Sequence, residues 1–416
     1  MIESLHSLPL TLRARFALLT AMFAIAVSYG IVMPMLPFLL EKLASKSDPA
    51  MLSRHTGLLS GTYAIALFLF APFWGKLSDA HGRRPVILLG LLGFAASLGL
   101  LGWMPTLPIL YIGRFLAGLF AAAVAPAAYA LICDHAPSEE WRAHRFALIS
   151  VAGSAGAFVG PLAGSTVLRG SDDMFGEGTE ETFAAVFLAA AGASLMAALA
   201  MWSLVPSFAE MNDARSDRAE RPSEWPLVAR LCSIVFVTAT AVGAFEVALS
   251  LRGKQTLGMD AFQVAMMFTE CGLVMFIVQA LVLSPLIKPQ MTRWLLGPAL
   301  AALAIGLVLT ALAKTHTMLM IDIAIVAASA GVVFPIVTYW VSFHAGSARG
   351  ANLGRVTGTA SLGQAVGSTT SGFLFDSPIL PNAAFAAATV IVMVGVVLSL
   401  ALPRLLLSKP STLNGD

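Results

Sequence analysis

The sequence predicts an all-α integral membrane protein in which twelve transmembrane helices form two pseudo-symmetric six-helix halves. Of its 416 residues, 58% are hydrophobic and only 12% are charged. Such a chain has too few polar side chains to cover a soluble globule of this size. Twelve apolar runs have, or nearly have, the length of about 20 residues that a helix needs to cross a bilayer. A charged connector divides these runs six and six.

The twelve runs define the predicted helices in chain order. They are Phe16 to Leu40, Gly57 to Trp74, Pro85 to Met104, Leu107 to Cys133, Phe146 to Leu168, Phe183 to Val205, Leu227 to Leu251, Phe262 to Ile287, Trp294 to Leu312, Met318 to Phe343, Val356 to Phe375 and Ala383 to Leu402. The predicted domains are an N-terminal half at 1–206, a cytoplasmic linker at 207–226 and a C-terminal half at 227–416.

The basic residues predict the orientation of the chain. With the N-terminus in the cytoplasm, 17 of the 25 Lys and Arg fall in cytoplasmic segments, 7 fall in external segments, and Arg114 falls within a run. The positive-inside rule then places both termini in the cytoplasm. The first run is longer than a signal-peptide core and no convincing cleavage site follows it, so we expect it to be retained as a helix.

Several classes of function find no support in the composition. The net charge of +2 gives no bulk polarity for nucleic acid, and the three cysteines have no paired spacing. No helix carries a histidine pair at metal-ligand spacing, and no phosphate-binding Gly-Lys-Ser/Thr loop is present. We therefore expect no cofactor, no metal, no nucleic-acid partner and no enzymatic activity.

The polar segment between the second and third runs carries the most specific motif. It reads Gly75-Lys76-Leu77-Ser78-Asp79-Ala80-His81-Gly82-Arg83-Arg84-Pro85, in which small residues let two helix ends approach. This segment resembles the loop between helices 2 and 3 in the major facilitator superfamily of secondary transporters. The resemblance implies a gate formed by Gly75, Asp79, Gly82, Arg83 and Arg84. Asp79 would point at the N-terminus of the eleventh run, near Arg355 and Val356.

Two further motifs are similar to the drug/proton antiporter branch of that superfamily. The first run ends in Gly30-Ile31-Val32-Met33-Pro34-Met35-Leu36-Pro37, and the fifth contains Gly153 to Ser165 with Gly156, Gly160, Pro161 and Gly164. We expect Pro161 to kink the fifth helix. Alternatively, these glycines form only a packing face, and in either case we expect them to pack the two halves together.

The fourth run reads Tyr111 to Gly118 around Arg114 and resembles the superfamily's motif in helix 4. A guanidinium at this depth must face water or a carboxylate, or be held by the first helix or a backbone carbonyl. The loop that follows, Asp134 to Arg142, looks like that of the tetracycline-efflux group. The resemblance implies a charge cluster of Asp79, Arg83 and Asp134, in which Arg83 pairs with Asp134.

Only three carboxylates lie well inside apolar runs: Glu246, Glu270 and Asp322. Many drug exporters place an acid in the first helix, but this chain has Ile25 to Tyr29 there, so a proton carrier must lie elsewhere. Burial disfavours the charged form of a carboxyl group, as proton exchange requires. All three are candidates for the proton carrier, and we favour Glu270 for its depth, then Glu246 because its helix is expected to line the cavity, ahead of Asp322. A static cluster of Arg114 with Glu246 and Asp322, or a neutral packing role for Glu270, remains open.

The expected function is proton-coupled efflux of a small amphipathic organic compound by alternating access, in a monomer spanning a bacterial inner membrane. The resemblance and the depth of the residues suggest a substrate cavity with Tyr29, Met33, Arg114, Glu246 and Tyr339. A metabolite importer or facilitator of the same fold is an alternative. A non-transporting membrane sensor or a membrane-embedded enzyme is an alternative of another class.

Overall fold

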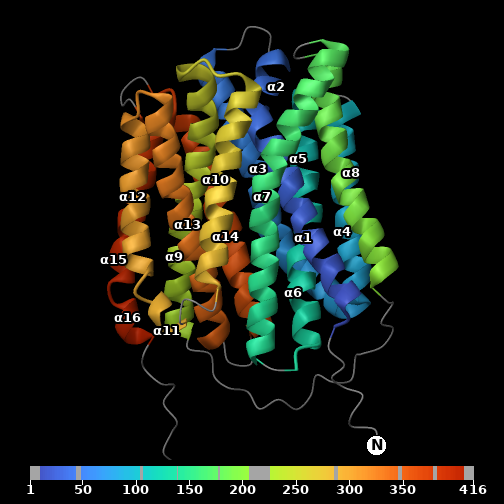
Figure 1. Cartoon of the computed structure of the whole chain (residues 1–416), viewed down its shortest axis with the longest axis vertical. Helices are drawn as coiled ribbons and strands as arrows, with labels where there is room; N and C mark the ends of the chain where they lie inside the picture. Colours follow the sequence, from blue (N-terminus) through green and yellow to red (C-terminus); the bar gives the residue numbers. More distant parts are fainter. Residues whose placement is uncertain are drawn as a thin grey trace, which may run out of the picture.

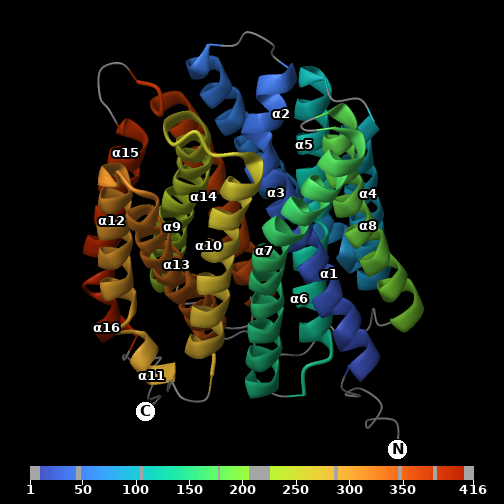
Figure 2. The ribbon, with the colours of Figure 1, turned by 45° about the horizontal axis from the view of Figure 1, so that its top comes forward.

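The computed structural model describes residues 10–43, 48–103, 106–137, 139–176, 179–205, 225–284, 289–344, 349–377 and 382–406. Within these ranges all regular elements are helical, and the long helices run side by side along one axis (Figure 1). Helices from the first half of the chain gather on one side of the bundle and those from the second half on the other (Figure 2).

The N-terminal half contains eight helices and one short 3-10 turn. They are α1 (Leu12–Val32), η2 (Met33–Met35), α2 (Leu36–Leu43), α3 (Pro49–His81), α4 (Arg83–Trp103), α5 (Leu107–Ala121), α6 (Val124–Asp134), α7 (Glu139–Phe175) and α8 (Glu180–Leu204). Two predicted helices are interrupted, the first at η2 and the fourth between α5 and α6. Pro37 and Pro126 lie four residues after the first residue of each interruption, Met33 and Ala122, and a proline removes a backbone hydrogen bond while its ring clashes with the preceding turn.

The C-terminal half repeats this arrangement with a π-helical turn, η3. Its elements are α9 (Trp225–Leu251), η3 (Arg252–Thr256), α10 (Ala261–Val282), α11 (Pro289–Thr292), α12 (Leu296–Leu312), α13 (His316–His344), α14 (Arg349–Leu374), α15 (Ala383–Ser399) and α16 (Leu402–Leu405). Helix α9 begins at Trp225, inside the range predicted as linker, and residues 206–224, which include most of that linker, lie outside the described residues.

The described helices account for the twelve predicted spans. Nine segments are long and apolar enough to cross a membrane, and α12 and α15 are shorter apolar helices. The twelfth, α14, has 26 residues and is rich in glycine, serine and threonine. The predicted twelve-helix architecture is confirmed.

Close glycine contacts reveal the pseudo-symmetry of the halves. In α7, a Cβ added to Gly156 would lie 2.5 Å from the carbonyl oxygen of Phe23 in α1. A Cβ added to Gly160 would lie 2.4 Å from the carbonyl oxygen of Val27, also in α1. On α14, a Cβ added to Gly363 would lie 2.5 Å from the Phe236 carbonyl oxygen of α9. A Cβ added to Gly367 would lie 1.9 Å from the Thr240 carbonyl oxygen of the same helix. Because the two residues contacted are four apart in each case, α1 with α7 and α9 with α14 are equivalent pairs.

These contacts correct one expectation about the fifth predicted helix. Its glycines pack against α1 within the N-terminal half, and do not join the two halves. The next residues around the helix make the contact with the other half: Ala157 and Phe158 meet Gly272 of α10, and Ser154 hydrogen-bonds Gln279. Since successive residues project about 100° apart on a helix, α7 presents its glycines to α1, while its backbone at Ala157 and Phe158 lies against the glycine of α10.

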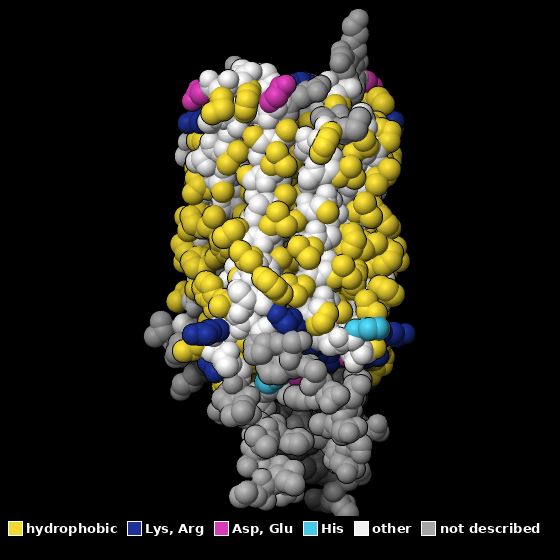
Figure 3. Space-filling view, turned by 90° about the vertical axis from the view of Figure 1, so that its right-hand side faces the viewer, with side chains coloured by type: hydrophobic (Ala, Val, Ile, Leu, Met, Phe, Trp, Pro, Cys, Tyr) yellow, Lys and Arg dark blue, Asp and Glu magenta, His cyan; other side chains and the backbone are white. Residues whose placement is uncertain are grey.

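The surface supports a membrane-spanning orientation. Figure 3 shows a broad apolar belt, with Lys and Arg gathered toward the end where α1 begins. We call this the inner end and the opposite one the outer end, following the positive-inside prediction. Helix α1 begins and α16 ends at the inner end (Figure 1).

Candidate functional site

Five side chains from both halves meet between the helices and form what we call the central cluster. They are Tyr29 of α1, Tyr63 of α3, Arg114 of α5, Glu246 of α9 and Gln364 of α14. The Tyr29 hydroxyl donates a 2.8 Å hydrogen bond to Glu246 Oε2. Gln364 Nε2 donates to the Tyr29 hydroxyl at 2.9 Å and to the same carboxylate oxygen at 3.2 Å. Glu246 is therefore hydrogen-bonded to both halves at once.

Arg114 supplies the positive charge of the central cluster. Only 1% of this residue is exposed, and its guanidinium carbon lies 4.6 Å from the Tyr63 ring centroid and 5.9 Å from that of Tyr29. Its Nε lies 3.4 Å from the Leu59 carbonyl oxygen, while its buried Nη2 has no hydrogen-bond partner within the described part of the chain. Glu246 lies within electrostatic range. Aromatic faces and a nearby carboxylate thus offset the cost of burying this cation.

Local packing turns Tyr29 toward the other half. The preceding residue, Ser28, is fully buried and donates a 2.9 Å hydrogen bond to the Ala190 carbonyl oxygen of α8. This contact fixes the rotation of α1, so that Tyr29 projects about 100° away. Met33, one turn later, is fully buried and accepts a hydrogen bond from Ser60 of α3. Met33 thus packs within the N-terminal half beside the central cluster.

The other two candidate carboxylates, Asp322 and Glu270, lie in different surroundings. Asp322 of α13 is buried near the outer end, where Arg252 of η3 is its electrostatic partner. Arg252 also donates hydrogen bonds to Asn382 and to the Ala313 carbonyl oxygen. Asp322 therefore belongs with Arg252 in the C-terminal half, while Glu246 shares the region of Arg114. The sequence suggested that Asp322 contacts Arg114, because the two residues lie at similar depth in the membrane. Depth does not determine which side of its helix each residue occupies.

Glu270 of α10 has a buried Oε2 atom without a hydrogen-bond partner in the described ranges. The adjacent Cys271 lies within electrostatic range of both Glu246 and Glu270. Glu246 of α9 and Glu270 of α10 thus border the same region around Cys271. The remaining predicted cavity residue, Tyr339, lies near the inner end of α13, where its ring centroid is 5.5 Å from that of Trp340.

The structure brings the predicted charge cluster of the hinge together. Arg83 Nε is 3.0 Å from Asp134 Oδ2, and Arg83 also pairs with Asp79 and donates to Ser78. Gly82 has a φ of 91°, a conformation that glycine adopts readily, and it separates α3 from α4. Gly75 makes no close approach, since a Cβ there would meet no atom within 4 Å. Arg84 donates to the Trp202 carbonyl oxygen of α8.

Polar contacts also join the halves at the outer end, and sequence reasoning did not identify them. Lys254 of η3 pairs with Glu41 of α2. Gln255 donates to the Ser53 hydroxyl at 3.1 Å, and Ser53 in turn donates to Asp376. We call this set the outer contacts. Their residues lie in short polar segments between apolar runs, where no motif marks them as partners.

Among the described residues, no group of three His, Cys, Asp or Glu side chains could hold a metal ion. The family model described as Major Facilitator Superfamily matches residues 18–346. The chain belongs to the major facilitator superfamily. The matched range includes Tyr29, Arg114 and Glu246, whereas Gln364 lies beyond it.

Relatives place this superfamily member in the drug-efflux branch. It is 33% identical over 321 residues to the tetracycline resistance protein, class C, of Escherichia coli, covering 74% of this chain and 76% of the relative. It is 28% identical over 388 residues to multidrug resistance protein 2 of Bacillus subtilis, covering 91% and 92%. The crystal structure of the human organic anion transporter MFSD10 shares its fold, with a TM-score of 0.72 at 21% identity, covering 93% and 99% of the two chains.

Proposed function

We propose that this protein exports a small amphipathic organic compound by alternating access, in exchange for protons. The observation that carries the proposal is Glu246, a carboxylate between the halves that accepts hydrogen bonds from Tyr29 of one half and Gln364 of the other. The tetracycline and multidrug resistance relatives support a drug-like substrate. The small number of charged side chains near the central cluster favours a substrate that carries little charge.

The central cluster suggests how a proton drives the cycle. As a carboxylate, Glu246 accepts both hydrogen bonds and offsets the charge of the buried Arg114. Proton binding removes that negative charge, so Arg114 then favours water or a polar group of the substrate. The hydrogen bond that Glu246 accepts from Tyr29 of the other half weakens at the same step, because a neutral carboxyl is a poorer acceptor. Loss of the proton on the other side restores the contacts.

Glu246 and Glu270 are the two candidates for carrying the proton. Glu270 is deeper, but neutralising it breaks no described hydrogen bond between the halves. Glu246 makes one such bond, with Tyr29, and a second bond with Gln364 of its own half, so a change in its charge is transmitted directly to both halves. We therefore propose Glu246 as the coupling residue and a secondary role for Glu270. Asp322, which lies within electrostatic range of Arg252 near the outer end, is proposed to hold the C-terminal half together.

Flux into proteoliposomes, with and without a pH gradient, tests this proposal. Tetracyclines and cationic dyes are suitable first substrates, because the relatives are tetracycline and multidrug resistance proteins. An antiporter accumulates substrate only while a gradient is imposed. A facilitator equilibrates substrate without a gradient, and a non-transporting sensor gives no flux with any compound. Uphill uptake that persists when the pH gradient is collapsed contradicts proton coupling.

The hinge is proposed to act as a gate at the inner end. Replacing Asp79 with Asn keeps the shape of the side chain but removes the charge that pairs with Arg83. We expect a several-fold loss of transport with little loss of folded protein, because a partly exposed ion pair near the protein surface contributes only about 1 kcal/mol to stability. The measurement is substrate flux at equal amounts of reconstituted protein.

Asp173→Asn, an exposed acid on α7 near the outer end, is the matched control. A rate for Asp79→Asn equal to that of the control would show that the hinge charge does not govern the gate.

The proposed setting is a bacterial inner membrane with both termini in the cytoplasm and a functional monomer. The basic end of the apolar belt in Figure 3 supports this orientation. A cysteine-labelling experiment on intact cells, with single cysteines at the chain termini, tests it.

A further inference from the structure

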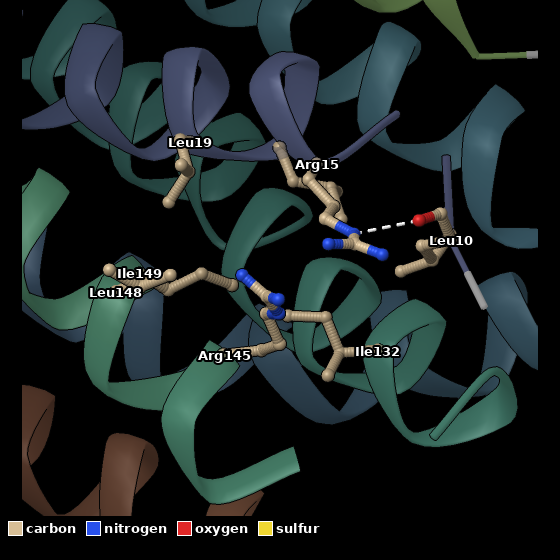
Figure 4. Close-up of a pocket in the computed structure, with 8 residues that line it drawn as sticks. Leu10, Arg15, Leu19, Ile132, Arg145, Leu148 and Ile149 are labelled. Carbon is tan, nitrogen blue, oxygen red and sulfur yellow. Dashed lines mark hydrogen bonds between the residues drawn. The ribbon is translucent and has the colours of Figure 1, made fainter. Parts of the chain in front are cut away.

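A pocket separate from the central cluster lies at the inner end of the bundle, between α1, α6 and α7. Its walls are almost entirely apolar, and two arginines enter it. Its lining residues include Leu10, Leu19, Ile132, Leu148, Arg15 and Arg145. Figure 4 shows the guanidinium groups of Arg15 and Arg145 extending toward each other from α1 and α7.

The two arginines lack a carboxylate partner among the described residues. Arg15 Nε donates a 2.7 Å hydrogen bond to the Leu10 carbonyl oxygen. Arg145 Nε is buried and has no hydrogen-bond partner in the same part of the chain. Both guanidinium groups lie near the Trp141 ring, at 5.5 and 5.1 Å from its centroid, and they are close enough to repel each other. An anion between them would remove this repulsion and supply the missing acceptor.

The pocket is continuous with the part of α1 that faces lipid. Leu12 is 79% exposed and Phe16 is 61% exposed, and with Arg15 and Leu19 they follow the spacing of one helix face. Exposed side chains of this type at the edge of an apolar belt contact lipid. Trp141 is a residue that favours the bilayer interface. An anion in this position can therefore leave an attached hydrocarbon chain in contact with the apolar walls.

We propose that this pocket binds an anionic phospholipid of the inner leaflet, with its phosphate between Arg15 and Arg145 and an acyl chain along Leu19 and Leu148. Basic pockets between transmembrane helices on the cytoplasmic side are suited to such headgroups. The apolar lining selects a lipid over free phosphate, which would gain nothing from these walls. This inference is independent of the transported substrate.

Native mass spectrometry of the full chain in detergent tests the proposal by titration with phosphatidylglycerol or phosphatidylcholine. We expect tighter binding of phosphatidylglycerol, weakened about fivefold for each charge removed in Arg15→Gln and Arg145→Gln. The Lys variants at both positions keep the charge and should retain most of the binding. The control is Arg230→Gln, because Arg230 of α9 likewise donates from its Nε to a backbone carbonyl, that of Leu398.

Three results would overturn the proposal. The first is equal affinity for the two lipids. The second is wild-type binding of phosphatidylglycerol by the double Gln variant, provided that it is folded as judged by its melting temperature. The third is displacement of the lipid by millimolar inorganic phosphate, which would make a soluble anion the occupant.

Discussion

Glu246→Gln is expected to reduce uphill transport to the level of liposomes without protein. Glutamine keeps the size of the side chain but cannot exchange a proton. Its amide oxygen can still accept hydrogen bonds from Tyr29 and Gln364, so the fold and substrate binding should persist. Energy-independent exchange of substrate across the membrane should therefore survive. The measurements are uptake driven by a pH gradient and exchange without one, in the same proteoliposomes.

Glu270→Gln provides the matched control, because it is the same substitution at an apolar depth on α10, the next long helix in the chain. We expect it to lower the rate of uphill transport without abolishing it. The opposite pattern, in which Glu270→Gln abolishes coupling and Glu246→Gln does not, would assign the proton to α10. Proton-dependent accumulation by the double variant would exclude both residues.

Gly367→Ala is expected to cause the largest loss of stability among Gly-to-Ala substitutions in the described part of the chain, because its added methyl group makes the shortest contact. The added methyl group would lie 1.9 Å from the backbone carbonyl oxygen of Thr240, so α14 must move away from α9. Overpacking of this kind costs about 1–3 kcal/mol, more than the gain of about 1 kcal/mol that alanine brings to a helix. We expect a lower melting temperature in detergent and a smaller folded yield.

Gly354→Ala is the control on the same helix, since its methyl group would meet no atom within 4 Å. It gains the helical propensity of alanine without a clash, so its melting temperature should equal or exceed that of the wild type. Equal stability of the two variants would contradict the close packing of α9 and α14.

The sequence predicts depth within the membrane better than it predicts lateral neighbours. Arg114 and Glu246 are recognisable because charge is rare in apolar runs, and the structure places them in the same region. Gln364 and Tyr63 were missed, since a neutral amide in a glycine-rich segment and a tyrosine in an apolar run carry no such signal. The proximity of Asp322 to Arg252 was missed as well. The rotation of α13 about its axis determines whether Asp322 faces Arg114 or Arg252, and this rotation depends on packing against several neighbouring helices at once.

The composition of α14 has a consequence for how the chain is assembled. Its Gly, Ser and Thr content keeps it outside the nine segments apolar enough to cross a membrane alone. Its glycines nevertheless lie against α9 and α3, in both halves. Such a segment gains little by partitioning from the translocon into lipid. We expect isolated α14 to fail insertion in a glycosylation-mapping assay and to insert efficiently when α13 and α15 are synthesised with it, so the N- and C-terminal halves join only after the last hairpin is made.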